Sequence, residues 1–490
     1  DNMIYIKENK PDDIYSYSCE IRSVSEDTSK PIRTTKIKIV APSATLSNNQ
    51  IVVDIPNVKK PIPLFIVMRA LGKESDLSII KTCLLDIDKN KHYIDLFIPS
   101  IHDANKIFSQ KTALEYIASF TKRGTIVGTL EILSDYLLPH IGEMNFLDKA
   151  YFIGYMTFNM LQVMQKERQP TDRDNFKFKR IELTGKLIYD LFREYFLIQN
   201  KDIARKIDEE YYWHKSEYID QSEGRNIKKK EKKDSSTYQN NFIGLIDSNF
   251  KSFFKERIVE NGFKKAFKGN WGSQANTKRL GVVQDLNRLS WNTYISHIRK
   301  LNLPLDSSAK VVGPRLLNGS QWGYIDPLDT PDGGNIGLHK HLAISTYITI
   351  GSSSKSIINW IRMFTSSKKI MECSYDYLAG STKIFVNGNW IAATDQPFKI
   401  IKQVKLYRRN GIFPIHNSIS FDYTQNEIHI YTDTGRLTRP IYYIDNGKES
   451  YNRQHIQEMI KANKVSWGQL VTGFLEKKDF FSFKQNKLYT

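Results

Sequence analysis

Hydrophobic and polar residues alternate in two short segments near the start of the chain. Residues 34–40 read TTKIKIV and residues 50–55 read QIVVDI, and this alternation predicts a strand in each segment. Residues 63–71 (PLFIVMRAL) are almost continuously apolar and are expected to be buried. Residues 113–120 and 148–164 place apolar residues three or four positions apart, which is the spacing of one helix face. The start of the chain is therefore expected to mix strands with helices.

The helix expected at residues 148–164 carries an apolar stripe rich in methionine. Flexible Met side chains fill gaps in protein cores, and they also line adaptable binding grooves. Because the first use is the commoner one, we expect this stripe to be buried. Its members are Phe152, Ile153, Met156, Met160, Leu161 and Met164.

The middle of the chain is more polar. We expect a charged turn at about residue 206, followed by an aromatic cluster at 211–213. Residues 228–233 (KKKEKK) are expected to lie in a solvated, mobile loop, with direct nucleic-acid contact as the alternative. Residues 250–267 return to a helical spacing of phenylalanines.

Turn signals separate the elements of the last third. Residues 330–333 (TPDG) fit a type I turn, because Pro presets φ at the second position and Gly follows at the fourth. Asn387-Gly388, inside the run 383–391 (KIFVNGNWI), predicts a β-hairpin. Residues 427–436 (EIHIYTDTGR) alternate and then turn, which predicts a further strand.

Composition narrows the class of protein. A chain of 490 residues is long enough for two to four domains, and its net charge of +18 favours an anionic partner, nucleic acid first. An AT-rich genome is the competing explanation for the excess lysine. Cys19, Cys83 and Cys373 lie far apart and form no CxxC pair, so no zinc ribbon is expected. A large chain with so few cysteines is also expected to be intracellular. No apolar run approaches the length of a membrane span.

Residues 269–343 combine glycines, aromatics, amides and basic residues more densely than any other part of the chain. Lys278 and Arg279 lie next to Gly281, as a basic pair on a flexible turn. Residues 284–300 contain no Gly or Pro and permit a helix. The polar and basic residues in that run are Gln284, Asn287, Arg288, His297, Arg299 and Lys300.

The order of short motifs in this stretch resembles the fork region of the second-largest (β-type) subunit of multisubunit DNA-dependent RNA polymerases. The motifs are GNWG at 269–272, RLGV at 279–282, LNR at 286–288, SHIRK at 296–300, PR at 314–315, WG at 322–323 and DTPDG at 329–333. Departures are mild: Lys300 replaces an arginine, Gln321 replaces the histidine before Trp-Gly, and Asp329 and Asp332 replace two glutamates.

The resemblance continues through most of the chain and implies a multidomain α+β fold of mixed helices and antiparallel sheets. Further motifs are RALG at 69–72, RGT at 123–125, LPHI at 138–141, FVNG at 385–388 and TDTGR at 432–436. Both ends of the family's subunit are expected to be missing. The implied segments are a lobe-like domain (1–205), the distal part of the protrusion (206–270), the fork (271–350), external region 1 (351–445) and the start of external region 2 (446–490).

The resemblance implies a subunit of DNA-directed RNA polymerase, a nucleotidyltransferase, that holds the RNA–DNA hybrid and downstream DNA near the active centre. In the family, Mg²⁺ is bound mainly by the largest subunit, so no catalytic residue and no metal ligand is expected in this chain. Implied partners are the largest subunit, other polymerase subunits, the DNA template, the RNA–DNA hybrid and nucleoside triphosphates, but no membrane. The fork loops would be residues 273–281 and 305–310. The residues expected to bind nucleic acid are Lys278, Arg279, Gln284, Asn287, Arg288, His297, Arg299, Lys300, Lys310 and Arg315.

Several alternatives stay open at this point. The chain could be a non-catalytic nucleic-acid-binding scaffold that retains this architecture, and it could work in a nucleus or, if viral, in a virion or host cytoplasm. Residues 172–174 (DRD) could bind a metal, although an ion-pair cluster or a helix N-terminus is simpler. His297 could be structural or face nucleic acid. Asp329 and Asp332 could form an acid/base pair, although turn capping is simpler.

Overall fold

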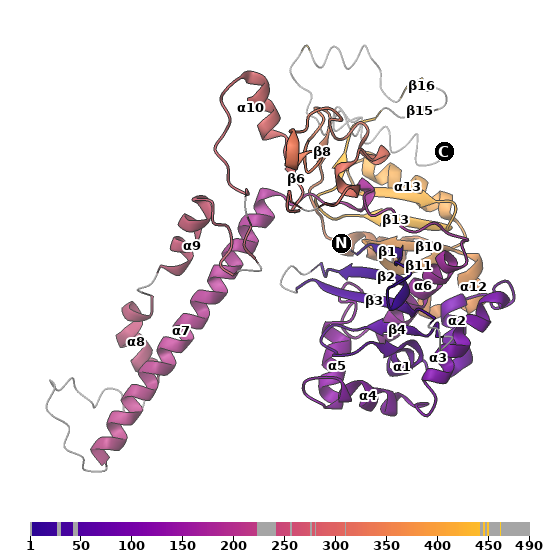
Figure 1. The fold of residues 1–490 in the computed structure, drawn as a ribbon, viewed down its shortest axis with the longest axis horizontal. Coiled ribbons are helices and arrows are strands. Elements are labelled where there is room, and N and C mark those ends of the chain that lie inside the picture. Colours follow the sequence, from indigo (N-terminus) through magenta and orange to yellow (C-terminus); the bar gives the residue numbers. More distant parts are fainter. Residues whose placement is uncertain are drawn as a thin grey trace. The chain divides into compact units, whose positions relative to one another are not determined.

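The computed structural model of the protein describes residues 2–26, 31–42, 48–222, 242–254, 257–274, 277–279, 281–308, 310–441, 444–445, 448–449 and 461. These residues form two compact units (Figure 1). Unit 1 comprises residues 1–181 and 301–490, and unit 2 comprises residues 182–300. Helices and antiparallel sheets are mixed, which confirms the expected α+β class.

The first sheet of unit 1 is an antiparallel meander in which every strand pairs with its neighbour in sequence. Its strands are β1 (Ile4–Glu8), β2 (Tyr15–Ser23), β3 (Arg33–Val40), β4 (Ile51–Asp54) and β5 (Ile62–Pro63). The two strands predicted from alternation are β3 and β4, and both predictions are confirmed. Six helices follow: α1 (Leu64–Ala70), α2 (Asp76–Leu84), α3 (Ile98–Asp103), α4 (Gln110–Ser119), α5 (Ile126–Asp135) and α6 (Phe146–Met164).

Helix α6 is the central element of unit 1. Its methionine-rich stripe is buried from Phe152 to Leu161, as predicted, and only Met164 at its end is partly exposed. Gly154 allows α6 to approach α2 closely, because a Cβ there would lie 2.6 Å from the Thr82 carbonyl oxygen. The stripe is therefore core.

The second sheet of unit 1 has the order β12-β13-β10-β11-β9. Its strands are β9 (Lys368–Lys369), β10 (Thr382–Val386), β11 (Asn389–Thr394), β12 (Ser418–Asp422) and β13 (Glu427–Tyr431), with helices α11 (Lys355–Phe364), α12 (Tyr375–Gly380) and α13 (Pro397–Arg409). Asn387 and Gly388 have φ of 50° and 82°, as the predicted tight hairpin between β10 and β11 requires. Phe385 and Trp390 of this hairpin pack in the same core as α6.

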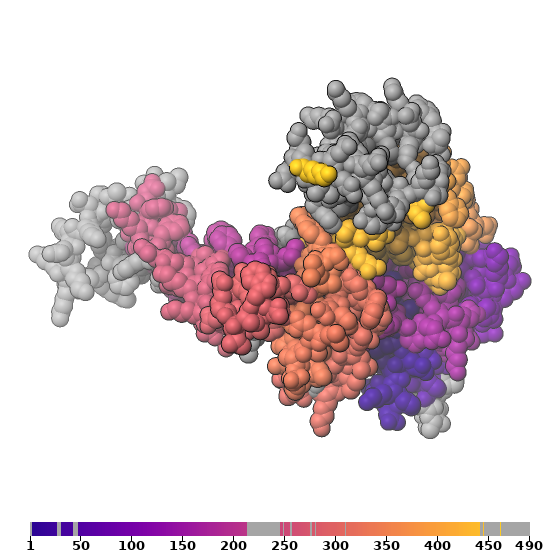
Figure 2. All heavy atoms as spheres, turned by 90° about the horizontal axis from the view of Figure 1, so that it is seen from above, coloured from indigo at the N-terminus to yellow at the C-terminus, as the bar shows by residue number. Residues whose placement is uncertain are grey.

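Residues 301–350, orange in Figure 2, contribute to the surface of unit 1 mainly through short elements and loops. The remaining short strands are β6 (Lys300–Asn302), β7 (His339–His341), β8 (Tyr347–Ile348), β14 (Leu437–Thr438), β15 (Ile444–Asp445) and β16 (Lys448–Glu449). The expected type I turn at residues 330–333 is wrong. Asp332 has an extended backbone (ψ 166°), and Gly333, with φ 70°, starts a 3-10 turn that ends at Asn335.

Unit 2 is helical and consists of α7 (Thr184–Ser222), α8 (Phe242–Phe253), α9 (Ile258–Phe267) and α10 (Trp291–Ile298). The predicted charged turn near residue 206 is wrong, because α7 continues through it. Ion pairs one helical turn apart support the helix there: Asp202 binds Arg205 (2.8 Å) and Lys206 (2.9 Å). The helical spacing over 250–267 belongs to two helices rather than one.

Other sequence-based expectations fall outside the described part of the chain. They are the basic run at 228–233 and, apart from residues 448–449 and 461, the start of external region 2. The five segments expected from the resemblance stay a prediction: α7 crosses position 205, and residues 271–350 contribute to both compact units.

Gly154→Val is expected to destabilise unit 1 by about 1–3 kcal/mol, because the new side chain must push α2 away from α6. The midpoint of urea unfolding measures the effect. Gly380→Ala is the matched control, since nothing lies within 4 Å of that position in α12 and a helix favours Ala. Equal losses of stability in the two variants would contradict the close α2–α6 packing.

Candidate nucleic-acid interface

The ten residues expected to bind nucleic acid fall in both units. Those from Lys278 to Lys300 lie in unit 2, in the segment before α10, on α10 itself and directly after it, whereas Lys310 and Arg315 lie in unit 1. The ten residues therefore form two groups, one in each unit.

The expected first fork loop is tightly closed. Trp271 and Arg279 form an isolated antiparallel bridge, with the Arg279 N–H donating to the Trp271 carbonyl at 2.9 Å. Gly272 has φ 93°, and a Cβ there would lie 2.5 Å from the Thr277 carbonyl oxygen, so only glycine fits. Lys278, next to the bridge residue Arg279, is exposed.

A carboxylate from α7 anchors this loop. Glu194 accepts hydrogen bonds from the Ser273 backbone N–H (3.1 Å), the Thr277 hydroxyl (2.7 Å) and the Ser273 hydroxyl. Burial opposes ionisation, but these hydrogen bonds outweigh it and hold the pKa of Glu194 below its usual value. No local pattern in the sequence pointed to Glu194, because it precedes the loop by about 80 residues.

The side chain of Arg279 already forms an ion pair within the protein. Its guanidinium pairs with Glu182, and this hydrogen bond raises the pKa of Arg279. The side chain stays 45% exposed. Arg279 can therefore meet a phosphate only in competition with a carboxylate, whereas Lys278 has no ion-pair partner among the described residues.

The helix expected over residues 284–300 begins only at Trp291, which corrects the expectation for its first half. Ser290 and Thr293 form a capping box, in which the Thr293 N–H donates to Ser290 Oγ at 3.2 Å. The helix starts at this cap, and the residues before it are irregular although they contain no Pro or Gly after Gly281 that would forbid a helix. Residues 281–290 are therefore a loop, and side chains must hold its shape.

His297 on α10 holds that loop. Its Nδ1 accepts the Asn287 backbone N–H at 3.1 Å, and its Nε2 lies 3.0 Å from Gln284 Oε1. Since a backbone amide only donates, Nδ1 carries no proton, and in the neutral ring Nε2–H donates to Gln284. Gln284 Nε2 in turn donates to the Gly281 carbonyl at 2.8 Å. We call these four residues the His297 clamp.

The His297 clamp leaves cationic and aromatic groups at the surface. The Arg288 guanidinium stacks on the Tyr294 ring, 4.6 Å from its centroid, and Trp291 is 75% exposed. Arg299 caps the C-terminus of α10, and Lys300 follows it. Such a surface suits phosphates and stacked bases.

Arg315 has a different role in unit 1. Its guanidinium donates to the carbonyls of Gly334 (2.6 Å), Ile336 (3.0 Å) and Ser307 (3.0 Å). These bonds tie the expected second fork loop to the glycine-rich segment after Thr330. Lys310, at the end of that loop, is exposed.

The segment around Thr330 is fixed by its own side chains. The Thr330 hydroxyl donates to the His339 carbonyl (3.0 Å) and accepts the Gly337 N–H (2.9 Å). His341 Nδ1 donates to the Asp329 carbonyl at 2.8 Å. Asp326, rather than Asp332, caps the local turn by accepting the Leu328 N–H at 3.0 Å.

The residues 172–174 form protein contacts. Asp172 accepts the Asn318 amide at 2.8 Å, and Arg173 pairs with Glu20, which agrees with the ion-pair interpretation. Across the part of the chain that the structure describes, no group of three or more His, Cys, Asp or Glu side chains is placed to hold a metal ion.

Comparison with known proteins identifies the family. Models of RNA polymerase Rpb2 domains match three separate ranges: domain 2 matches residues 1–182, domain 3 matches 284–348 and domain 4 matches 384–445. The DNA-directed RNA polymerase II subunit RPB2 of Encephalitozoon cuniculi is 33% identical over 97% of this chain, and the DNA-directed RNA polymerase II subunit 2 of Arabidopsis thaliana is 31% identical over 97%. The chain belongs to the family of second-largest RNA polymerase subunits.

The likeness to second-largest subunits extends beyond eukaryotes. The archaeal subunit Rpo2 of Saccharolobus shibatae is 27% identical over 86% of the chain. The chain spans 39% of the length of the two eukaryotic relatives and 35% of the archaeal one. None of the helices that the structure describes has the length and hydropathy of a bilayer-spanning segment.

His297→Ala is expected to raise the amide-exchange rate of Asn287 roughly fivefold, because each lost hydrogen bond costs about 1 kcal/mol. Hydrogen exchange of residues 281–290 measures the change. Asn292→Ala, on an exposed part of the same helix, is the control. Unchanged exchange in both variants would mean that the His297 clamp does not hold the loop.

Arg315→Lys separates positioning from simple charge. Lysine keeps the positive charge but cannot reach three carbonyls with a planar fork, so amide exchange should rise at residues 305–308 and 333–337. Lys310→Arg, which alters an exposed cation in the same region, is expected to leave that exchange unchanged. Retained protection in Arg315→Lys would contradict the positioning role.

Proposed function

We propose that this chain is part of a DNA-directed RNA polymerase and grips the RNA–DNA hybrid and downstream DNA beside the active centre during transcription. The observation that carries the proposal is the His297 clamp with its exposed cations, lying in a stretch that matches domain 3 of this family. The names of the relatives favour a polymerase subunit over a non-catalytic scaffold.

The proposed grip depends on phosphates rather than bases. Lysine and arginine neutralise phosphates and fix a duplex in place without reading its sequence. A polymerase must accept every template, so this kind of contact suits it. Lys278, Arg288, Arg299 and Lys300 supply charge in unit 2, while Gln284, Asn287 and His297 act mainly by shaping the loop.

In unit 1, Lys310 would contact nucleic acid directly and Arg315 would act mainly through the backbone it holds. Arg279 would contribute less than Lys278, because Glu182 already satisfies part of its charge. Some of the ten residues would thus touch the polynucleotide, and the others would hold the loops that carry those contact residues.

Catalysis would need the rest of the assembly. The proposed partners are the largest subunit, other polymerase subunits, the DNA template and nucleoside triphosphates. Mg²⁺ would be held mainly by the largest subunit. The relatives named as RNA polymerase II subunits favour a nuclear location.

Charge reversal tests the grip. Arg288→Glu and Arg299→Glu are each expected to speed dissociation of the assembled polymerase from a preformed DNA–RNA scaffold and to reduce the slope of log K against log [KCl] by about one. Arg279→Glu should have a smaller effect because of Glu182.

Lys111→Glu, an equal charge change on the exposed face of α4, is the control and should leave the salt slope unchanged. Identical slopes in the Arg288 and Arg299 variants and the unmutated enzyme would refute this placement of the hybrid.

A further inference from the structure

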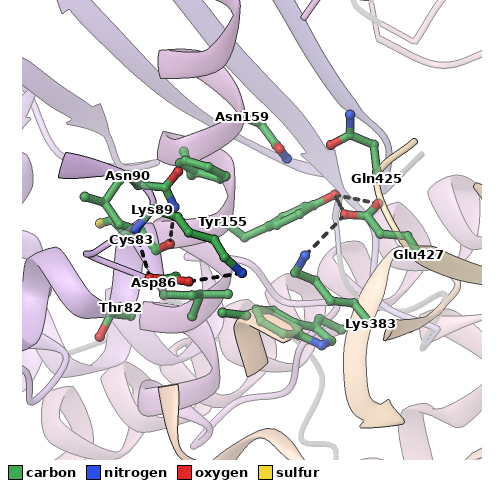
Figure 3. Close-up of a pocket in the computed structure, with 15 residues that line it drawn as sticks. Thr82, Cys83, Asp86, Lys89, Asn90, Tyr155, Asn159, Lys383, Gln425 and Glu427 are labelled. Carbon is green, nitrogen blue, oxygen red and sulfur yellow. Dashed lines mark hydrogen bonds and ion pairs between the residues drawn. The ribbon is translucent and has the colours of Figure 1, made fainter. Parts of the chain in front are cut away.

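A cavity of about 150 Å³ lies inside unit 1, between α6 and the second sheet (Figure 3). Tyr155 and Asn159 of α6 line one side, Lys383 and Glu427 of the second sheet line another, and the segment from Thr82 to Asn90 lines a third. None of these residues belongs to the proposed hybrid grip. The cavity is therefore a separate feature of the molecule.

Lys383 is the unusual member of the lining. Its side chain is only 16% exposed, and Figure 3 shows its ammonium group pointing into the cavity. Among the described residues it has no hydrogen-bond acceptor: the nearest carboxylate oxygen, on Glu427, is 4.0 Å away. No hydrogen bond offsets the partial burial of this ammonium group, and that burial lowers the pKa of Lys383.

Glu427 is already engaged by other groups. The Tyr155 hydroxyl lies 2.8 and 2.9 Å from its two carboxylate oxygens, and His429 Nε2 lies 3.4 Å from one of them. The Glu427 side chain is 4% exposed, so solvent does not share these contacts. Lys383 therefore meets this carboxylate only as an ion pair at 4.0 Å, beyond hydrogen-bonding distance.

A second cationic side chain, that of Arg168, lies near Lys383. Arg168 is half-buried and donates from Nη1 to Asn159 Oδ1 (2.9 Å) and Gln425 Oε1 (3.2 Å), which are both neutral amides. Its positive charge opposes the protonated form of Lys383, whereas the negative charge of Glu427 favours that form more strongly. Lys383 and the half-buried Arg168 thus lie close enough for their charges to interact, and Glu427 is the carboxylate that pairs with Lys383.

The mouth and the size of the cavity limit what could enter. Lys89 also points toward the space and pairs with Asp86 at 3.4 Å, so these two nearly cancel. The volume is about ten times what a single water needs, but well below the ~300 Å³ of sites for drug-sized molecules. A nucleotide is too large, whereas a small anion with a few waters fits.

We propose that this cavity binds a small oxyanion, a phosphate or a carboxylate, whose oxygen accepts hydrogen bonds from the Lys383 ammonium. The anion would balance the excess positive charge and would connect α6 to the second sheet. The proposal is independent of the grip on nucleic acid.

The test uses the complete protein that carries this chain, titrated with sodium phosphate and, separately, sodium acetate at constant ionic strength set with NaCl. Saturable binding should raise Tm by roughly 2–4 °C at tenfold the half-saturating concentration. It should also slow hydrogen exchange in residues 82–90 and 382–386. A response to phosphate alone would identify a phosphate site, and a response to acetate as well would identify a general carboxylate and phosphate site.

Lys383→Met and Lys383→Gln should abolish the saturable part of both responses, whereas Lys369→Met, at an exposed lysine on β9 of the same sheet, should keep it. Isothermal titration of the unmutated protein gives a result even if the Lys383 variants fold poorly. No saturable binding in the unmutated protein, or equal binding in the Lys383 variants, would overturn the proposal and leave water as the occupant.

Discussion

The interface depends on hydrogen bonds from a few side chains to irregular backbone. Loops lack the repeating bonds of helices and sheets, so their polar groups need other partners. Glu194, His297 and Arg315 each provide such partners, and each binds backbone groups of a different loop segment. Because these anchors carry the shape, Lys278 and Arg288 stay at the surface with their charge available.

In unit 1, hydrogen bonds from residues far away in the sequence hold the loop that precedes the Thr330 region. The Phe176 N–H donates to the Ser320 hydroxyl at 2.8 Å, and Asp172 accepts the Asn318 amide at the same distance. These bonds join residues 172–176 to residues 318–320. The residues 172–174, which resemble a metal cluster in sequence, thus help to hold this loop in place.

Cationic side chains lie in different environments in the two units. Arg288 lies at the surface against an aromatic ring, where a polyanion can reach it with little loss of solvation. Lys383 lies inside unit 1, where desolvation disfavours its charge and where any anion that reaches it would be strongly held. Burial, not residue type, separates a proposed grip on nucleic acid from a proposed site for a small ion.

The sequence by itself determined the elements whose signal is local. Alternation predicted β3, the helical stripe predicted α6, and Asn387-Gly388 predicted the hairpin, because each depends on neighbours within a few residues. The ordered motifs also identified the family. Only the tertiary structure decided which charged residues are free to act. Arg279 meets Glu182 at a separation of 97 residues, and Arg315 meets three carbonyls 8, 19 and 21 residues away, and no local periodicity encodes such contacts.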